Sequence, residues 1–489
     1  MGLFSEDYNG KLYINNEFVA SKGSERMTLT NPWDESTVAT DIHAANTADI
    51  DAAVAASLHA VKKGPWKTFT GAQRGACMLK FADLVEQNMD KLARLESLPT
   101  GRPISMIRHF DLPHLLQVYR YYAGWADKIA GKSFPEDNGV YKIVRYEPVG
   151  VCAGIASWNA TFLYVAWKIA PALAAGCSFI FKASEKSPLG VLGIAPLFAE
   201  AGFPPGVVQF VTGGRETGEA LSSHMDIAKI SFTGSAIGGR AVHQAALKSN
   251  MKHCTLELGG KSPALVFNDA PFEAAVGAIS QGFLANSGQI CVASSRVIVQ
   301  EDIAPKFIEA VKAQFESVTQ SIGADPLELT TTHGPVVDKA QYDRVMSYID
   351  IGKKDAELVT GGSRKGNKGC VIEPTLFSNP KADSRIWTEE IFGPVLSIKT
   401  FKTEEEAIAL ANGTTYGLAS TIYTTNLTRG LRVASAIEAG VISINSPFIP
   451  EVQSPFGGMK QSGTGRELGE EGLKAYLEPK AININMNVE

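Results

Sequence analysis

The 489-residue sequence lacks the features that mark several classes of protein. Its six cysteines are scattered without a C-x-x-C pair, which argues against a structural zinc site or a disulfide framework and favours a reducing compartment. It has no apolar run that could span a bilayer, and its start lacks the basic and apolar blocks of a signal peptide. The net charge of -5 disfavours a nucleic-acid surface. We therefore expect a cytoplasmic protein with no nucleic-acid, membrane or metal partner.

Between residues 151 and 258, short apolar runs alternate with longer segments of helical spacing. The apolar runs predict buried strands at 151–156, 178–182, 206–211, 227–232 and 253–258. The segments between them predict helices at 161–176, 187–202, 216–224 and 236–249. Strict alternation implies right-handed crossovers and a parallel sheet covered on both faces. This is a doubly wound α/β fold, whose ligands bind at the carboxyl ends of its strands.

The segments before and after this region also have patterns that predict secondary structure. A mostly helical region, 47–129, comes before it, and a second α/β series follows residue 259, with predicted strands at 263–267, 295–299 and 393–398. The pattern of 139–150 predicts a strand that leaves the main body, and 480–489 alternates as an edge strand would. Unpaired strand edges invite pairing with another chain, so we expect an oligomer. The alternative is that the tail strand pairs within its own subunit.

Two segments carry residues suited to a nucleotide. Thr233, Gly234 and Ser235 lead from a strand directly into a helix, where free backbone amides favour an anion. No G-x-G-x-x-G follows a strand, so the common dinucleotide fingerprint is missing. Lys182 closes a predicted strand with Glu185 three residues later, and both could bind a ribose. The alternative is a solvated lysine and an acid favoured at a helix start.

Two further residues suit catalysis. Glu257 lies in the apolar run T-L-E-L, and such surroundings raise the pKa of a carboxylate toward that of a general base. Cys291 lies in a loop between a helix and a strand, where a thiolate needs nearby amides, a helix end or a base. Taken alone, Cys291 also fits a buried structural cysteine.

These residues occur in a definite order, together with Asn159 in "ASWNATF" and the run "EEIFGPVLSI". With "LELGGKSP" and "GQIC" as the most specific segments, the chain resembles the NAD(P)-dependent aldehyde dehydrogenase superfamily over nearly its whole length. The branch it resembles most oxidises free aldehydes. The resemblance implies a Rossmann-like cofactor domain (1–130 and 150–259), an α/β catalytic domain (260–465) and oligomerisation strands (131–149 and 475–489). It also implies a homo-oligomer, a tetramer or a dimer.

The resemblance implies a role for each matching residue. Cys291 corresponds to the nucleophile that attacks an aldehyde, Asn159 to the oxyanion hole, and Glu257 to the base that activates water. Lys182 and Glu185 correspond to contacts with the adenosine ribose. The remaining cofactor contacts would be Trp158, Gly234, Ser235, Glu390 and Phe392. Because Glu185 would repel a 2′-phosphate, we expect NAD, with NADP as the alternative. Ala183 stands where the family commonly has proline, which leaves the ribose geometry less fixed.

The substrate tunnel also follows from the resemblance. Its walls would include Tyr164, Trp167, Ile290, Val292 and Phe456. Tyr164 and Trp167 suggest an aromatic box for a quaternary ammonium group. Ala160, Ala285 and Pro450 leave that box incomplete, so we expect a roomy apolar pocket for aliphatic or aromatic aldehydes. The alternative is that Tyr164 and Trp167 only pack their helix onto the sheet.

Three other functions compete with this interpretation. A CoA-acylating dehydrogenase would keep the cysteine but typically lacks the carboxylate at Glu257. A cofactor-independent esterase or thiol hydrolase could use Cys291 and Glu257. A catalytically silent structural relative would be expected to have lost one of the three catalytic residues, and none is lost.

Overall fold

The computed structural model describes residues 9–488, and its centre is an eight-stranded sheet. Five parallel strands stand in the order β11-β10-β7-β8-β9. Their bounds are Val151–Ile155 for β7, Ser178–Lys182 for β8, Val208–Val211 for β9, Lys229–Thr233 for β10 and His253–Glu257 for β11. The crossover helices are α6 (Thr161–Ala175), α7 (Pro188–Glu200), α8 (Arg215–Ser223) and α9 (Ala236–Lys248). Every one of these elements lies within two residues of its predicted bounds, and the predicted α/β fold is confirmed.

The edges of this sheet come from distant parts of the chain. The hairpin of β1 (Leu12–Ile14) and β2 (Glu17–Val19) pairs antiparallel with β9. At the other edge, the two-residue β19 (Gly463–Thr464) pairs antiparallel with β11. A small separate sheet joins β3 (Arg26–Thr30) and β4 (Thr37–His43). After β4 the chain forms a series of helices: α1 (Thr47–Lys62), α2 (Gly71–Gln87), α3 (Met89–Thr100), α4 (Ile104–Met106) and α5 (Leu112–Ala123).

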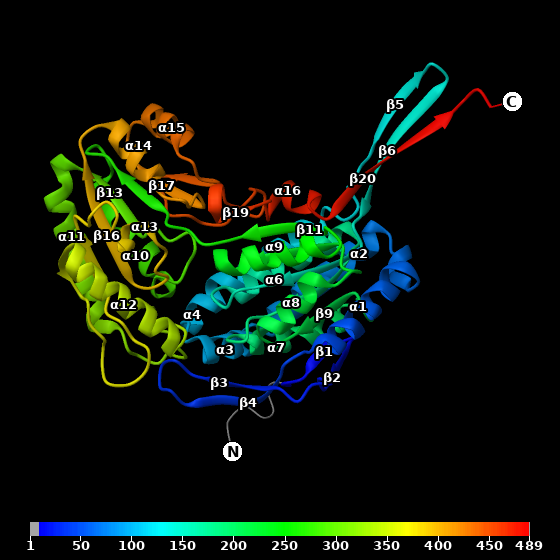
Figure 1. Ribbon diagram of the computed structural model, residues 1–489, viewed down its shortest axis with the longest axis horizontal. Helices are drawn as coiled ribbons and strands as arrows, with labels where there is room; N and C mark the ends of the chain where they lie inside the picture. The colour runs from blue at the N-terminus through cyan, green and yellow to red at the C-terminus, as the bar shows by residue number, and fades with distance from the viewer. Residues whose placement is uncertain (1–8, 489) are drawn as a thin grey trace.

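The second α/β series forms a seven-stranded sheet of its own, beside the first (Figure 1). Its order is β14-β15-β16-β13-β12-β17-β18, and only β14 runs antiparallel to its neighbour. The strands are β12 (Pro263–Val266), β13 (Arg296–Gln300), β14 (Glu357–Thr360), β15 (Thr375–Ser378), β16 (Val395–Phe401), β17 (Ala419–Tyr423) and β18 (Val441–Ile444). The helices are α10 (Phe272–Leu284), α11 (Ala304–Ser321), α12 (Lys339–Asp355), α13 (Arg385–Thr388), α14 (Glu404–Asn412), α15 (Leu427–Ala436) and α16 (Gly469–Lys474), the last of which follows β19.

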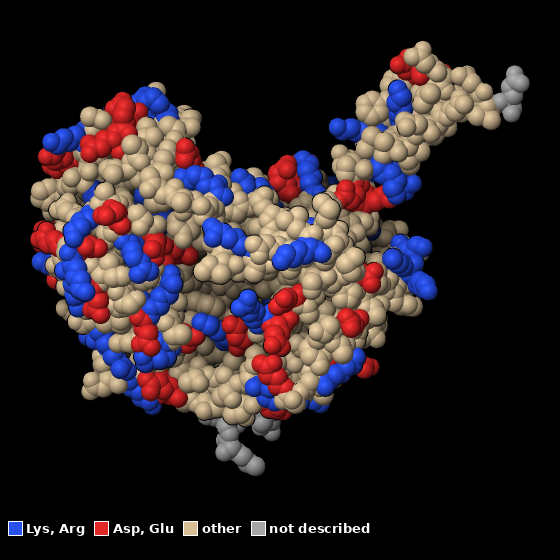
Figure 2. Space-filling view, viewed as in Figure 1, with Lys and Arg blue, Asp and Glu red and all other residues tan. Residues whose placement is uncertain are grey.

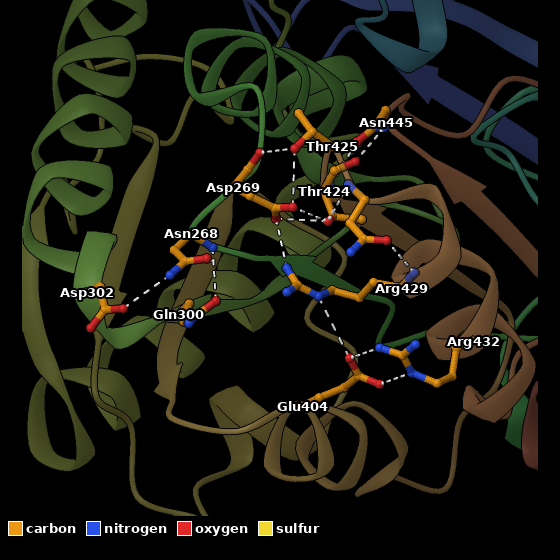
Figure 3. Close-up of polar contacts among 11 residues, drawn as sticks. Asn268, Asp269, Gln300, Asp302, Glu404, Thr424, Thr425, Arg429, Arg432 and Asn445 are labelled. Carbon is orange, nitrogen blue, oxygen red and sulfur yellow. Dashed lines mark hydrogen bonds and ion pairs between the residues drawn. The ribbon is translucent and has the colours of Figure 1, made fainter.

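Polar side chains fill the carboxyl ends of the strands in this second sheet (Figure 3). Asp269, just after β12, accepts hydrogen bonds from Thr424 at 2.8 and 2.9 Å and from Arg429 at 2.9 Å. Glu404 of α14 accepts two bonds from Arg432 of α15 at 2.7 and 2.8 Å. These groups satisfy one another and tie β12 and β17 to the covering helices. Cys291, by contrast, precedes β13 and so lies at the opposite, amino end of that strand.

A third sheet projects from the body as a ribbon (Figure 1). It consists of β5 (Lys132–Asp137), β6 (Val140–Pro148) and β20 (Leu477–Asn485) in the order β20-β6-β5. The tail strand pairs with β6 of its own subunit over nine residues, as the alternative prediction held. The outer edge of β20 has no partner strand within residues 9–488. The part of the tail that the structure describes is therefore both paired internally and open on one side.

Across the face shown in Figure 2, acidic and basic side chains are intermixed rather than gathered into a region of one sign. Within residues 9–488, no helix is long and apolar enough to cross a membrane, and no cluster of ligating side chains is arranged to hold a metal ion.

Candidate active site

Cys291 follows an unusual turn. In the short helix η3 (Ala285–Gly288), Asn286, Ser287 and Gly288 have φ values of 50°, 54° and 71°. Left-handed conformations are costly for residues with a side chain, so the surroundings must hold this turn. The backbone and side-chain N–H groups of Gln289 donate to the Asn286 carbonyl at 3.1 and 3.0 Å. Val337 N donates to Gln289 Oε1 at 2.9 Å, which fixes the turn to the neighbouring segment.

Two cavities meet at this cysteine. One, of about 260 Å³, is mostly apolar, and the other, of about 340 Å³, is more polar. Residues that line both are Asn159, Tyr164, Thr233, Glu257, Leu258 and Cys291. The shared wall combines the carboxyl ends of β10 and β11 with the loop before β13. A doubly wound sheet is expected to place ligands at such strand ends, and here the second sheet adds the cysteine.

Asn159 lies between β7 and α6 and is buried, with 4% of its surface exposed. Its Nδ2 donates to the carbonyl oxygen of Gln289 at 3.0 Å, and its Oδ1 accepts from the Tyr164 hydroxyl at 3.0 Å. Asn286 Nδ2 donates back to the Asn159 carbonyl at 3.3 Å. The Asn159 side chain is thereby oriented toward the loop that carries Cys291.

Glu257 ends β11 with only 3% exposure, and neither of its carboxylate oxygens has a hydrogen-bond partner within the described chain. Burial, and after it the carboxylate of Glu467, raises the pKa of Glu257 well above its usual range, while Lys168 opposes this. Lys168 Nζ and Glu467 Oε1 form a buried ion pair at 2.6 Å. Burial thus favours the protonated form of this carboxyl, in the direction expected from the T-L-E-L segment.

The pKa of the Cys291 thiol is also raised. Burial, followed by the nearby carboxylates of Glu390 and Glu257, raises its pKa to about 12, and the backbone amides of Cys291 and Val292 oppose this. Hydrogen bonds from these two amides stabilise a thiolate, but they lower the pKa by less than burial raises it. In this state the thiol is protonated, so its reaction as a nucleophile requires a group that accepts the proton.

The polar cavity is built around the start of α9. Its lining includes five of the seven residues expected to contact the cofactor: Trp158, Gly234, Ser235, Glu390 and Phe392. Ser235 caps α9, where its Oγ accepts from Gly238 N at 3.2 Å, so free amides of the first turn face this region. Glu390 accepts from Gly260 N at 2.9 Å, and burial raises its pKa to about 7. Anion-binding amides, a carboxylate and aromatic rings together fit a nucleotide cofactor.

Helix α12 contributes residues to this cavity that the sequence did not indicate. Gln341 Nε2 donates to the Phe392 carbonyl at 2.8 Å, and Arg344 Nη2 donates to the Glu390 carbonyl at 2.8 Å. Phe392 has a φ of 63° and meets the Trp158 ring edge-on at 5.5 Å. The helix thus holds the segment 390–392 in place. Only the spacing of two polar residues on one helix face could have suggested this, and such spacing is common.

Lys182 and Glu185 do not line the polar cavity. Lys182 ends β8 as predicted, and its buried Nζ donates to the Ala183 carbonyl at 3.0 Å. Glu185 is half exposed, and one of its carboxylate oxygens lies 3.8 Å from Lys182 Nζ. Burial lowers the pKa of Lys182, and Glu185 opposes this. The two residues lie together, outside the cavity, and precede α7.

All five residues predicted for the substrate tunnel line the apolar cavity: Tyr164, Trp167, Ile290, Val292 and Phe456. Ala160, Ala285 and Pro450 line it too, so their small or compact side chains do leave space there. Trp167 packs 4.9 Å from Phe456 and donates from its indole nitrogen to His114 at 2.9 Å. The sequence did not indicate the further aromatic walls, Phe110 and Phe448, nor the buried pair of Arg102 and Asp111.

Comparison with known proteins places this architecture in one family. The model of the aldehyde dehydrogenase family matches residues 18–482. An aldehyde dehydrogenase of Davidiella tassiana is 46% identical over 477 residues, which cover 97% of this chain and 95% of the relative. "Aldehyde dehydrogenase, cytosolic 1" of Mus musculus is 43% identical, with 98% and 95% covered. The chain belongs to the aldehyde dehydrogenase family.

Solved structures agree. The NAD+ complex of an aldehyde dehydrogenase from Bacillus cereus has a TM-score of 0.94 and 40% identity. The match covers 97% of this chain and 96% of the B. cereus chain. The betaine aldehyde dehydrogenase betB from Staphylococcus aureus, also solved with NAD+, has a TM-score of 0.95 and 36% identity, with 99% and 96% covered. The fold of this protein is that of the aldehyde dehydrogenases.

Proposed function

We propose that this protein oxidises an aldehyde to the carboxylic acid with NAD, through a covalent thiohemiacetal and then a thioester on Cys291. One observation carries the proposal. Cys291 lies where the apolar and polar cavities meet, and Asn159 and Glu257 line the same junction. An aldehyde in one cavity and a cofactor in the other would both reach the sulfur atom.

The residues of the polar cavity would hold the cofactor. The amides after Gly234 and Ser235 suit its pyrophosphate, Glu390 suits a ribose hydroxyl, and Trp158 and Phe392 flank the remaining space. Lys182 and Glu185 would bind the adenosine ribose, where the carboxylate disfavours the 2′-phosphate of NADP. The relatives from B. cereus and S. aureus were solved with NAD+, which supports the same choice here. When bound, NAD would accept the hydride that leaves the substrate carbon.

The chain's own groups would perform the remaining steps. The Cys291 thiol gives up its proton to solvent water, and the sulfur attacks the aldehyde carbon. The oxygen of the former carbonyl becomes an alkoxide, which Asn159 Nδ2 and the Cys291 amide stabilise by hydrogen bonds. Loss of hydride leaves a thioester. Glu257 then takes a proton from water, whose oxygen attacks the thioester carbon, and the acid leaves as the thiol re-forms.

The lining of the apolar cavity supports an uncharged substrate. Its aromatic and aliphatic walls suit an aliphatic or aromatic aldehyde, and Arg102 is already paired with Asp111 in a buried ion pair. A CoA-acylating enzyme is disfavoured because Glu257 is present to activate water. An esterase without cofactor would leave the polar cavity without a purpose, and calorimetry with NAD distinguishes the two.

We further propose the division into a cofactor domain (1–130 and 150–259), a catalytic domain (260–465) and oligomerisation strands (131–149 and 475–489). The open edge of β20 supports a homo-oligomer, a dimer or tetramer, joined through the ribbon. The name of the mouse relative supports a cytoplasmic location.

An aldehyde panel with NAD, followed at the absorbance of NADH, tests the main proposal on the wild type and on Cys291→Ala. We expect turnover of apolar aldehydes by the wild type and none by the variant. Mass spectrometry of enzyme quenched during turnover should detect an acylated peptide that contains Cys291. An unimpaired alanine variant would overturn the proposal.

A further inference from the structure

Tyr164 is the only side chain within residues 9–488 that donates a hydrogen bond to the Asn159 side-chain oxygen. We propose that Tyr164 is a positioning residue, which holds the Asn159 carboxamide so that one N–H group points at the reacting oxygen of the substrate. This inference rests on the proposed function, because it gives Tyr164 a role that acts through the oxyanion hole.

The hydrogen bonds of Asn159 fix the orientation of its side-chain amide. Its Nδ2 donates to the Gln289 carbonyl at 3.0 Å, and its Oδ1 accepts from the Tyr164 hydroxyl at 3.0 Å. A flipped amide would set two oxygens against each other at Gln289 and would leave the hydroxyl facing an NH₂ group. Nδ2 carries two hydrogens, and the second has no partner among the contacts of residues 9–488. That hydrogen is the one available to a substrate oxygen.

The Gln289 carbonyl links this arrangement to the nucleophile. It accepts from Asn159 Nδ2 and also from Asn286 Nδ2 at 3.3 Å, within the left-handed turn that precedes Cys291. Tyr164, Asn159 and the cysteine loop therefore form one continuous set of hydrogen bonds. Tyr164 belongs to α6 in the first sheet's layer, whereas the loop precedes a strand of the second sheet. The bonds consequently fix the oxyanion donor and the sulfur relative to each other.

The tyrosine hydroxyl is suited to this task. Tyr164 is 4% exposed, and burial, followed by Cys291 and Glu467, raises its pKa well above the usual range. It stays a neutral donor at every pH at which the enzyme would work. A hydroxyl that donates to an amide oxygen polarises the amide and strengthens its N–H as a donor. Without the hydroxyl, a buried amide oxygen loses its partner, and the amide is free to rotate.

Tyr164→Phe tests the idea, because it removes the hydroxyl and keeps the ring that lines the apolar cavity. Loss of one oxyanion-hole donor costs roughly 10²–10³ in kcat. Partial loss of its orientation should cost less than loss of the donor, so we expect the rate constant of the NADH burst to fall by about 10-fold at saturating aldehyde. Tyr122→Phe is the matched control, since Tyr122 is also buried and donates to a backbone carbonyl, that of Gly469, at 2.9 Å. Its burst should stay within about twofold of the wild type.

Two further measurements separate positioning from a structural effect. Alkylation of Cys291 by iodoacetamide needs no oxyanion hole, so its rate should be the same in Tyr164→Phe and the wild type. In the Asn159→Ala background, Tyr164→Phe should cause no further loss, because Tyr164 acts through Asn159. If Tyr164→Phe does not fold, Tyr164→Met, which also lacks the hydroxyl, replaces it.

The proposal is overturned if the burst of Tyr164→Phe matches the wild type, or if only the KM for aldehyde rises. It is equally overturned if alkylation slows in parallel with the burst, or if the loss persists in the Asn159→Ala background. These outcomes differ from failure of the proposed function, which an active Cys291→Ala variant would show whatever Tyr164 does.

Discussion

The buried ion pair between Lys168 and Glu467 predicts a large loss of stability when one partner is removed. The exposed fractions of the two side chains are 0% and 4%, and Nζ lies 2.6 Å from Glu467 Oε1. Nζ also donates to Ser231 at 2.9 Å and to Thr233 at 2.8 Å, so all three ammonium hydrogens are used. Lys168→Met keeps the length of the side chain but removes the charge. Glu467, whose Oε2 already has no partner, would then be a buried uncompensated carboxylate.

Breaking a buried pair by removing one partner costs about 3–5 kcal/mol, and we expect a loss of that size in the free energy of unfolding at pH 7. Urea unfolding followed by tryptophan fluorescence measures it. The double variant Lys168→Met/Glu467→Gln removes both charges and should recover most of the loss. Lys168 also lowers the pKa of Glu257, so the single variant should need a higher pH for thioester hydrolysis. A loss below about 1 kcal/mol, the size of an exposed pair, would refute this reasoning.

Three other predictions concern the reaction itself. Glu257→Gln should still release a burst of about one NADH per site, while steady turnover falls about 10²–10⁴-fold with the loss of a general base; a missing burst would mean that Glu257 deprotonates the thiol. Alkylation of Cys291 in the free enzyme should rise with pH beyond pH 9, because burial raises the thiol pKa to about 12 and the thiolate is the reactive form; a plateau near pH 8 would contradict this. Glu185→Gln should raise kcat/KM with NADP relative to NAD, since it removes a charge that repels the 2′-phosphate; an unchanged ratio would place the ribose elsewhere.

The first sheet could be predicted from sequence because its strands are buried on both faces. Such strands are continuous apolar runs, and β7, β8 and β10 have every residue buried. The edge strand β19 could not be predicted in this way. It has two residues, and its place beside β11 depends on pairing across some two hundred residues of chain, with Leu258 N donating to Ser462 O at 2.8 Å. No local pattern records such a contact.

The residues of the site likewise fall into two groups: those that the local sequence indicates, and those that only the folded chain brings together. Glu257 and Cys291 lie in segments whose local context is distinctive, and Lys168 could have been found as the one charge in a wholly buried apolar helix. Glu467 has no such signal, because only the folded chain brings it beside Lys168 and Glu257. The same is true of Gln341 and Arg344, whose function in the cavity is to hold the backbone of another segment. Residues that act by supporting others leave little trace in a single sequence.

Burial has opposite consequences for the two halves of the proposed reaction. It disfavours the Cys291 thiolate, so attack on the aldehyde starts from a protonated sulfur. The same burial raises the pKa of Glu257, which makes its carboxylate a stronger base once it has lost its proton. A more exposed site would ionise the thiol more readily, but it would give a weaker base and admit water before the acyl group has formed. The arrangement therefore favours the hydrolytic step, and the first step depends on how well Asn159 receives the alkoxide.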